Sequence, residues 1–177
     1  MIEKTVSLAL TGHRPHKFLG EYDISHYSYR NLFNELITII EKVLNKSEKL
    51  ILISGMALGA DTIWAYAIVK MKEKYPNRIK FEAHCPCPNQ DIKWEDENKK
   101  QYKWLLSKAD EIIYYAEEYP GPLILQKRNE GMINNSDYLI AVYDNKSTKG
   151  GTVNAINYAK KINKNIIYIN PENILKK

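Results

Sequence analysis

Long apolar runs are absent from this sequence. Its longest apolar segments reach about six residues, whereas a helix that crosses a bilayer needs about 20. We therefore expect no transmembrane helix and no membrane partner. The first residues lead directly into a strand-length run rather than into the longer apolar segment of a secretion signal, which favours a cytoplasmic protein.

Cysteine is also scarce, with Cys85 and Cys87 on either side of one proline. They lie too close together in the chain to staple a fold, so we expect reduced thiols. His84 precedes them, but two thiols and one imidazole without a second cluster make a poor zinc site. The other histidines have a spacing that matches no metal motif: His13, His16 and His26. The sequence therefore predicts no metal and no cofactor.

The composition is that of a globular protein. A chain of 177 residues with 44% hydrophobic and 27% charged residues is predicted to form one domain over residues 1–177. Its formal net charge of +5 would help to attract an anionic ligand, including nucleic acid. Because the excess is mostly scattered lysine, we interpret it as a solvated surface rather than as a DNA-binding stripe.

Strand-like apolar runs alternate with amphipathic helical stretches along the chain. The predicted strands cover residues 5–10, 50–54, 79–84, 111–115, 138–143 and 165–169. The predicted helices cover residues 29–44, 58–75, 91–108, 125–135 and 152–162. This alternation implies right-handed crossovers. The predicted fold is a single Rossmann-like α/β domain, with a mostly parallel sheet and helices on both faces.

Three glycine-bearing segments directly follow predicted strands. They are residues 11–15 (Thr-Gly-His-Arg-Pro), 54–61 (Ser-Gly-Met-Ala-Leu-Gly-Ala-Asp) and 149–152 (Lys-Gly-Gly-Thr). A strand, a glycine-rich turn and a helix in succession point free backbone N–H groups at an anion. In an open parallel sheet such turns meet at the carboxyl edge, near a topological switch point. Together they predict a composite pocket for a phosphate-bearing ligand.

These segments, with Gln-Lys-Arg-Asn at 126–129 and Asn-Ser-Asp at 135–137, resemble the YpsA-like branch of the SLOG superfamily. SLOG domains are Rossmann-like. They include the LOG phosphoribohydrolases, which act on nucleoside monophosphates, and the DNA-processing DprA/Smf proteins, while others sense nucleotide-derived signals. The resemblance thus implies a nucleotide-type ligand more firmly than a reaction. Leu58 stands where DprA commonly has a basic residue, which weakens the DNA interpretation.

The resemblance also implies roles for single residues. Arg128 matches the arginine with which LOG enzymes act on the ribosyl phosphate, and the Gly-Gly-Thr turn is present. The LOG glutamate three residues beyond that turn is missing, because Asn154 and Ala155 stand there. Neither side chain can act as a base, so LOG-type hydrolysis would need Asp61 or Asp144 as a substitute carboxylate.

Four of the singled-out residues have a structural alternative. Arg14 would clamp a phosphate bidentately or form a surface salt bridge. Arg128 would contact the ligand or be a charge on a helix surface. Asp61 would accept hydrogen bonds from ribose hydroxyls or cap its helix, and the sequence leaves both open. Trp94 would stack on a base or anchor the third helix in the core.

The favoured function is binding of a nucleotide or nucleotide-derived small molecule by a sensor or sequestering domain. Two alternatives stay open: a nucleotide-processing (phosphoribo)hydrolase with a non-standard catalytic carboxylate, and a single-stranded DNA-binding module. Besides the small molecule, the partners considered are a second copy of the chain, in a homodimer, and nucleic acid. No catalytic residue is assigned. The candidate phosphate- and ligand-binding residues are Thr11, Gly12, His13, Arg14, Ser54, Gly55, Gly59, Asp61, Arg128, Asp144, Gly150, Gly151, Thr152 and Asn154.

Overall fold

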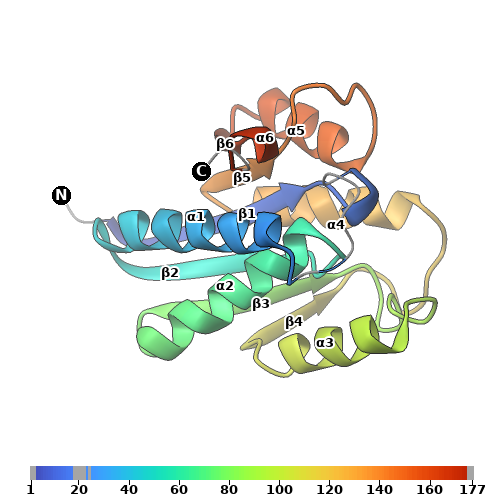
Figure 1. The fold of residues 1–177 in the computed structure, drawn as a ribbon, viewed down its shortest axis with the longest axis horizontal. Coiled ribbons are helices and arrows are strands. Elements are labelled where there is room, and N and C mark those ends of the chain that lie inside the picture. The colour runs from blue at the N-terminus through green and yellow to red at the C-terminus, as the bar shows by residue number, and fades with distance from the viewer. Residues whose placement is uncertain (1–2, 18–22, 24, 175–177) are drawn as a thin grey trace.

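The strands among the described residues all lie parallel in one sheet (Figure 1). The computed structural model describes residues 3–17, 23 and 25–174, so the ends of the domain predicted over 1–177 lie outside the described residues. In chain order the strands are β1 (Glu3–Gly12), β2 (Ser47–Ser54), β3 (Ile79–Cys85), β4 (Glu111–Tyr114), β5 (Tyr138–Val142) and β6 (Asn165–Ile169). Their order across the sheet is β4-β3-β2-β1-β5-β6, and every neighbouring pair is parallel. The predicted Rossmann-like α/β fold is confirmed.

Helices connect the strands as predicted. They are α1 (Tyr27–Leu44), α2 (Ala60–Lys74), α3 (Asp96–Leu106), α4 (Leu123–Asn134) and α5 (Gly151–Lys161). Two short helices were not predicted: the 3-10 helix η1 (Pro15–Lys17) after β1 and α6 (Pro171–Ile174) after β6. The helix predicted from residue 91 begins five residues later. Residues 91–93 form a turn instead, in which the N–H of Trp94 donates to the carbonyl of Asp91.

The central strands bury both of their faces. Leu8 and Leu10 of β1 belong to one core together with α1 and α2, whereas Ala9 between them packs in a second core with α4 and α5. Most of the apolar face predicted for α1 is buried in the first core (Leu32, Leu36, Ile39 and Ile40), and its last member, Val43, is partly buried against that core. Each such side chain contributes about 1.5–3 kcal/mol on burial. None of the described helices is long and apolar enough to cross a membrane.

The direction of the chain reverses beside β1, and this decides where a ligand can enter. From β1 to β4 the chain moves outwards with α1, α2 and α3 on one face of the sheet. It then returns through α4 on the other face to place β5 on the free side of β1, as Figure 1 shows with α4 behind the sheet. Right-handed crossovers in opposite directions require this change of face. The switch point therefore lies between the carboxyl ends of β1 and β5.

Candidate ligand-binding site

A cavity of about 440 Å³ opens at the switch point. The three glycine-bearing turns lie at this one edge of the sheet, as predicted, because each leaves the carboxyl end of a parallel strand. Of the candidate residues, those that line the cavity are Thr11, Gly12, His13, Arg14, Asp61, Arg128, Gly150, Gly151 and Thr152. The volume falls in the range of about 300–1,000 Å³ that is usual for small-molecule sites.

The amino end of α5 supplies backbone donors to this cavity. Gly150 precedes the helix with a φ of 121°, and no side chain among the described residues caps the helix. The first intrahelical bond runs from Asn154 N–H to the Gly150 carbonyl, so the N–H groups of the three preceding residues have no partner within the helix. A Cβ on Gly151 would meet no atom within 4 Å, so the cavity reaches this backbone directly. The helix dipole adds about half a positive charge here.

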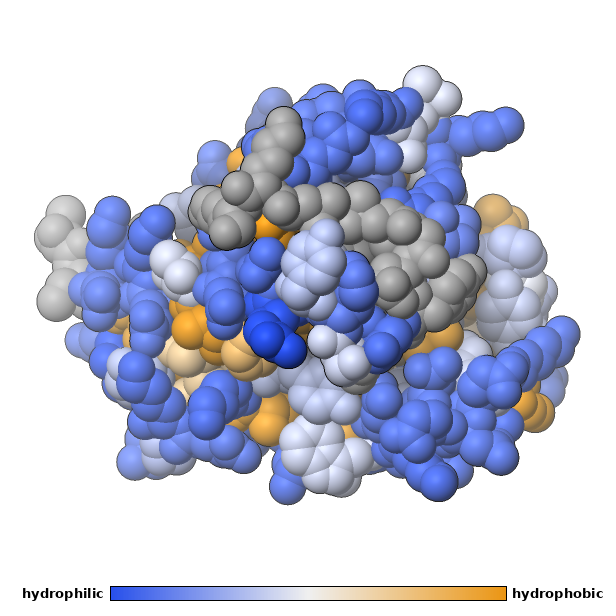
Figure 2. Space-filling view, in the orientation of Figure 1, coloured by the Kyte–Doolittle hydropathy of each residue, from blue (hydrophilic) through white to orange (hydrophobic). Residues whose placement is uncertain are grey.

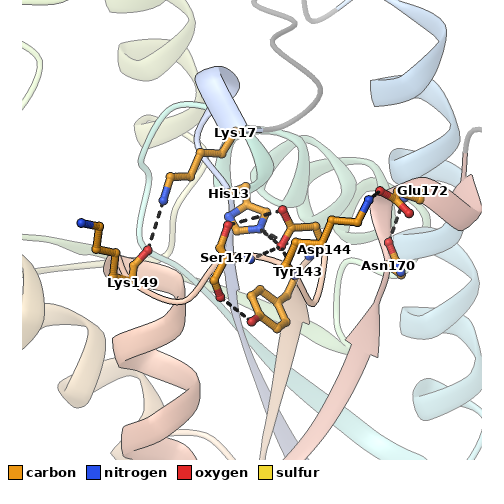
Figure 3. Close-up of polar contacts among 9 residues, drawn as sticks. His13, Lys17, Tyr143, Asp144, Ser147, Lys149, Asn170 and Glu172 are labelled. Atoms are coloured by element: carbon orange, nitrogen blue, oxygen red, sulfur yellow. Dashed lines mark hydrogen bonds and ion pairs between the residues drawn. The ribbon is translucent and has the colours of Figure 1, made fainter.

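Cationic side chains stand at the cavity mouth. Lys17 in η1 donates through its ammonium to the carbonyl of Lys149 at 3.1 Å, directly before the α5 turn (Figure 3). Arg14 is exposed, and its guanidinium makes no hydrogen bond or ion pair with any described residue. His16 lines the same side. The sequence carried no signal for Lys17, because its contact joins residues 132 positions apart.

Arg128 lies in the cavity floor rather than on a helix surface, so the surface-charge alternative is wrong. Only 4% of Arg128 is exposed. Its Nη1 donates to the carbonyls of Gly55 and His84, and its Nε is buried without a partner among the described residues. Nη2 makes no hydrogen bond there either and is not fully buried, so it is the guanidinium nitrogen available to the cavity.

Asp61 faces Arg128 across Gly55. A Cβ on Gly55 would collide with the Arg128 guanidinium and lie 2.7 Å from Oδ2 of Asp61, so only glycine leaves room for the two side chains. Burial raises the pKa of the Asp61 carboxyl, against the opposing effect of the Arg128 charge. Burial likewise lowers the pKa of Arg128, and the Asp61 charge counters that shift. Asp61 is the one carboxylate among the described residues that line the cavity.

Ser54 and the other two candidate glycines hold the turns to one another. Ser54 Oγ donates to the Asp61 carbonyl at 3.2 Å and accepts from the Met56 N–H at 3.1 Å, which closes the β2–α2 turn. A Cβ on Gly12 would collide with the side chain of Ala60. A Cβ on Gly59 would lie 2.7 Å from the backbone oxygen of His13. Gly12 and Gly59 are therefore needed for the close packing of one turn against another, rather than for the approach of a ligand to the backbone.

His13, which lines the cavity, pairs with Asp144, which does not. Nε2 of His13, a residue 2% exposed, lies 3.2 Å from Oδ1 of Asp144 (Figure 3). Partial burial acts to raise the pKa of Asp144, but hydrogen bonds from the N–H groups of Ser147 and Lys146 and from His13 hold this pKa at about 2. Nε2 of His13 also accepts a hydrogen bond from the backbone N–H of Asp144 at 3.4 Å, so the carboxylate and the amide of Asp144 both contact the imidazole. Asp144 does not line the cavity; it orders the β5–α5 loop and orients His13.

The remaining candidates lie outside the cavity. Asn154 is exposed on α5. Trp94 packs edge-to-face on Tyr102, with ring centroids 5.3 Å apart, beside a separate small cavity. The aromatic ring that does line the main cavity is Tyr119, which is 49% exposed in the loop before α4. Sequence reasoning did not select it among thirteen tyrosines.

Two features bear on hydrolysis and on metals. Ala155, which the resemblance aligns with the LOG glutamate, is 3% exposed and packs in the second core. Within the described part of the chain, no group of three or more His, Cys, Asp or Glu side chains is arranged to hold a metal ion. Cys85 is buried, and burial raises the pKa of its thiol to about 11.

Residues 8–174 match the family model YpsA, described as the YspA SLOG family. The chain belongs to the YpsA SLOG family. The SPbeta prophage-derived protein YoqJ of Bacillus subtilis (strain 168) is 40% identical over 141 residues, which cover 73% of this chain and 81% of YoqJ. The UPF0398 protein YpsA of the same organism is 32% identical over 141 residues, with 77% and 75% covered.

Two solved structures of DNA processing protein A (DprA) share the fold of this YpsA-family chain. The protein from Streptococcus pneumoniae superposes with a TM-score of 0.63 at 17% identity over 93% of this chain, which spans only 50% of that DprA. The protein from Helicobacter pylori, described for its single-stranded DNA binding mode, superposes with a TM-score of 0.58 at 19% identity, with 96% and 71% covered. At these identities the likeness concerns the fold alone.

Proposed function

We propose that this protein binds a nucleotide or nucleotide-derived small molecule in the switch-point cavity, as a sensing or sequestering domain. The observation that carries the proposal is the uncapped amino end of α5, which opens onto the cavity at Gly151. A phosphate there would accept hydrogen bonds from the free N–H groups and gain from the helix dipole. Membership of the YpsA SLOG family supports a nucleotide-type ligand.

Charged side chains surround the proposed phosphate position. Arg14 makes no hydrogen bond or ion pair with any described residue, and its charge acts on Asp61 only at longer range, so its guanidinium donors are available to bind two phosphate oxygens. The Lys17 ammonium would lie only 3.2 Å from a Cβ on Gly150, which places it beside the same turn. Arg128 would contribute through Nη2 from the floor.

The rest of the cavity suits a nucleoside. Tyr119 offers an exposed ring on which a base can stack, and it lines the cavity with Pro122 and Leu125 near the start of α4. Asp61 and Asn129 are the polar groups that would meet ribose hydroxyls. A ring for the base and backbone donors for the phosphate, both lining one cavity, are what a mononucleotide requires.

Arg14→Ala is expected to weaken nucleotide binding about 10- to 150-fold, which corresponds to the loss of about 1.5–3 kcal/mol from a charge-assisted contact. Calorimetric titration with AMP, GMP, CMP and UMP would measure this, after native mass spectrometry of the purified protein for a retained nucleotide. Arg30→Ala is the matched control, because Arg30 is an exposed arginine on α1 away from the cavity. Equal affinity in the two variants, or no binding by the wild type, would contradict the proposal.

No efficient release of free base from nucleoside monophosphates is expected. A missing acid–base group lowers a rate by about 100- to 10,000-fold. Ala155 is a core residue, Asp144 is held in its loop, and Asp61 is buried against Arg128. Chromatography of products after incubation with AMP would test this. Rapid release that disappears in Asp61→Asn would show instead a hydrolase with a relocated carboxylate.

Single-stranded DNA is the second candidate ligand, and the shared fold with DprA favours it. The cations at the cavity mouth would then contact the DNA backbone. The affinity of such a complex for an oligonucleotide would fall steeply with salt, by about 0.7 in log affinity per log salt for each phosphate contacted. A mononucleotide held by one phosphate would show a much shallower dependence.

A further inference from the structure

A second cavity, of about 400 Å³, lies along α5. Its lining includes Tyr143 after β5, Tyr168 of β6, and Asn157 and Lys160 of α5. Val153, in the first turn of α5, lines both this cavity and the one at the switch point. The two cavities therefore adjoin at the first turn of α5.

The two tyrosines come together through the register of the sheet. Tyr168 pairs with Ala141, and Tyr143 follows two residues later, so both side chains belong to the same sheet face. Ile166, also on that face, packs in the second core with α5. Tyr143 and Tyr168 thus lie beside α5 at the carboxyl edge, the edge that also holds the switch-point cavity.

The side chains around this second cavity suit a nucleobase. Tyr168 is 47% exposed, and the Tyr143 hydroxyl is already used, since it donates to the Ser147 carbonyl at 2.6 Å. Asn157 and Lys160 are exposed and make no side-chain hydrogen bond with any described residue. Figure 2 shows a predominantly hydrophilic surface over α5. Aromatic rings for stacking, together with a free amide and an ammonium, are the groups that read unstacked bases.

We propose that the cavity formed by Tyr143, Asn157, Lys160 and Tyr168 binds a second nucleoside, joined by a phosphodiester to the nucleoside in the switch-point cavity. The inference rests on the proposed function, because the bridging phosphate would occupy the α5 amino end. The ligand class is then a dinucleotide or the end of an oligonucleotide, with one base in each of the two cavities.

The test compares ligands that differ by one base. Calorimetry would measure binding of the mononucleotides AMP, GMP, CMP and UMP and of the dinucleotides ApA, GpG, CpC and UpU, whose single phosphate is the bridging one. Tyr168→Ala is expected to weaken dinucleotide binding roughly 5- to 150-fold, the usual cost of a lost base–aromatic stack, and to leave mononucleotide binding unchanged. Tyr114→Ala is the matched control, because Tyr114 is 42% exposed on β4, at the opposite edge of the sheet.

A charge variant provides a second measurement that does not depend on packing. Lys160→Glu should weaken dinucleotide binding selectively, whereas Lys161→Glu, its exposed neighbour outside the cavity, should not. If the wild type binds mononucleotides but these variants leave dinucleotide binding unchanged, the second subsite is overturned and the proposed function stands. If the wild type binds neither kind of ligand, the proposed function itself fails and the subsite with it.

Discussion

Replacing Arg128 by methionine is expected to lower the free energy of unfolding by about 3–5 kcal/mol at neutral pH. The substitution removes the guanidinium that bonds to the carbonyls of Gly55 and His84 and that faces the carboxylate of Asp61. Asp61 is only 8% exposed, so its charge would remain in a low-dielectric site without a counter-charge. Thermal and denaturant unfolding of the variant beside the wild type would measure the loss.

The loss should shrink as the pH is lowered towards about 4, the ordinary range of an aspartate. Burial raises the pKa of Asp61, and removal of the Arg128 charge would raise this pKa further. When the pKa of a carboxyl is higher in the folded than in the unfolded protein, the folded state is favoured at low pH, where the group is protonated in both states. This contribution to the free energy of unfolding is lost as the pH rises through the folded pKa. The double variant Asp61→Asn/Arg128→Met should recover part of the stability. A loss that is independent of pH would contradict a buried charge pair.

Gly151→Asp is expected to abolish nucleotide binding, with an affinity at least about 100-fold lower, because like charges brought together cost several kcal/mol. The new carboxylate would occupy the position proposed for the phosphate, at the first residue of α5. Open space surrounds a Cβ there, so the backbone accepts a side chain without collision. Acidic residues at a helix amino end are stabilising by about 0.3–1 kcal/mol, so the melting temperature should rise while binding is lost.

Gly151→Asn separates charge from bulk in this experiment, since the two side chains have the same shape. The asparagine variant should retain much of the affinity for AMP, GMP, CMP and UMP, and the aspartate variant should not. Equal loss in both variants would show that the side chain blocks the cavity sterically. Equal retention in both would place the phosphate away from α5 and overturn the proposed site.

The fold was predictable from this sequence because each element has a local signature. The strands, such as β2 and β5, are short apolar runs, and the helices, such as α1, are amphipathic stretches. Periodicity over a few residues is enough to recognise both kinds of element. The parallel order and the single edge for the glycine turns follow, because crossovers are right-handed. The start predicted for α3, at residue 91, was wrong. Residues 91–93 form a turn, and no change in the sequence pattern separates this turn from the helix that follows it.

The sequence by itself determined the six strands with their parallel direction, the five main helices, and the edge at which Gly12, Gly55 and Gly151 would meet. Only the tertiary structure decided what each residue does at that edge. It turned Gly55 towards Arg128 and Asp61 and left Gly151 open to the cavity. It also brought Lys17 to the α5 turn and placed Tyr119, not Trp94, in the wall. These contacts join segments far apart in the chain. They depend on how the return through α4 seats β5 beside β1, which no local pattern encodes.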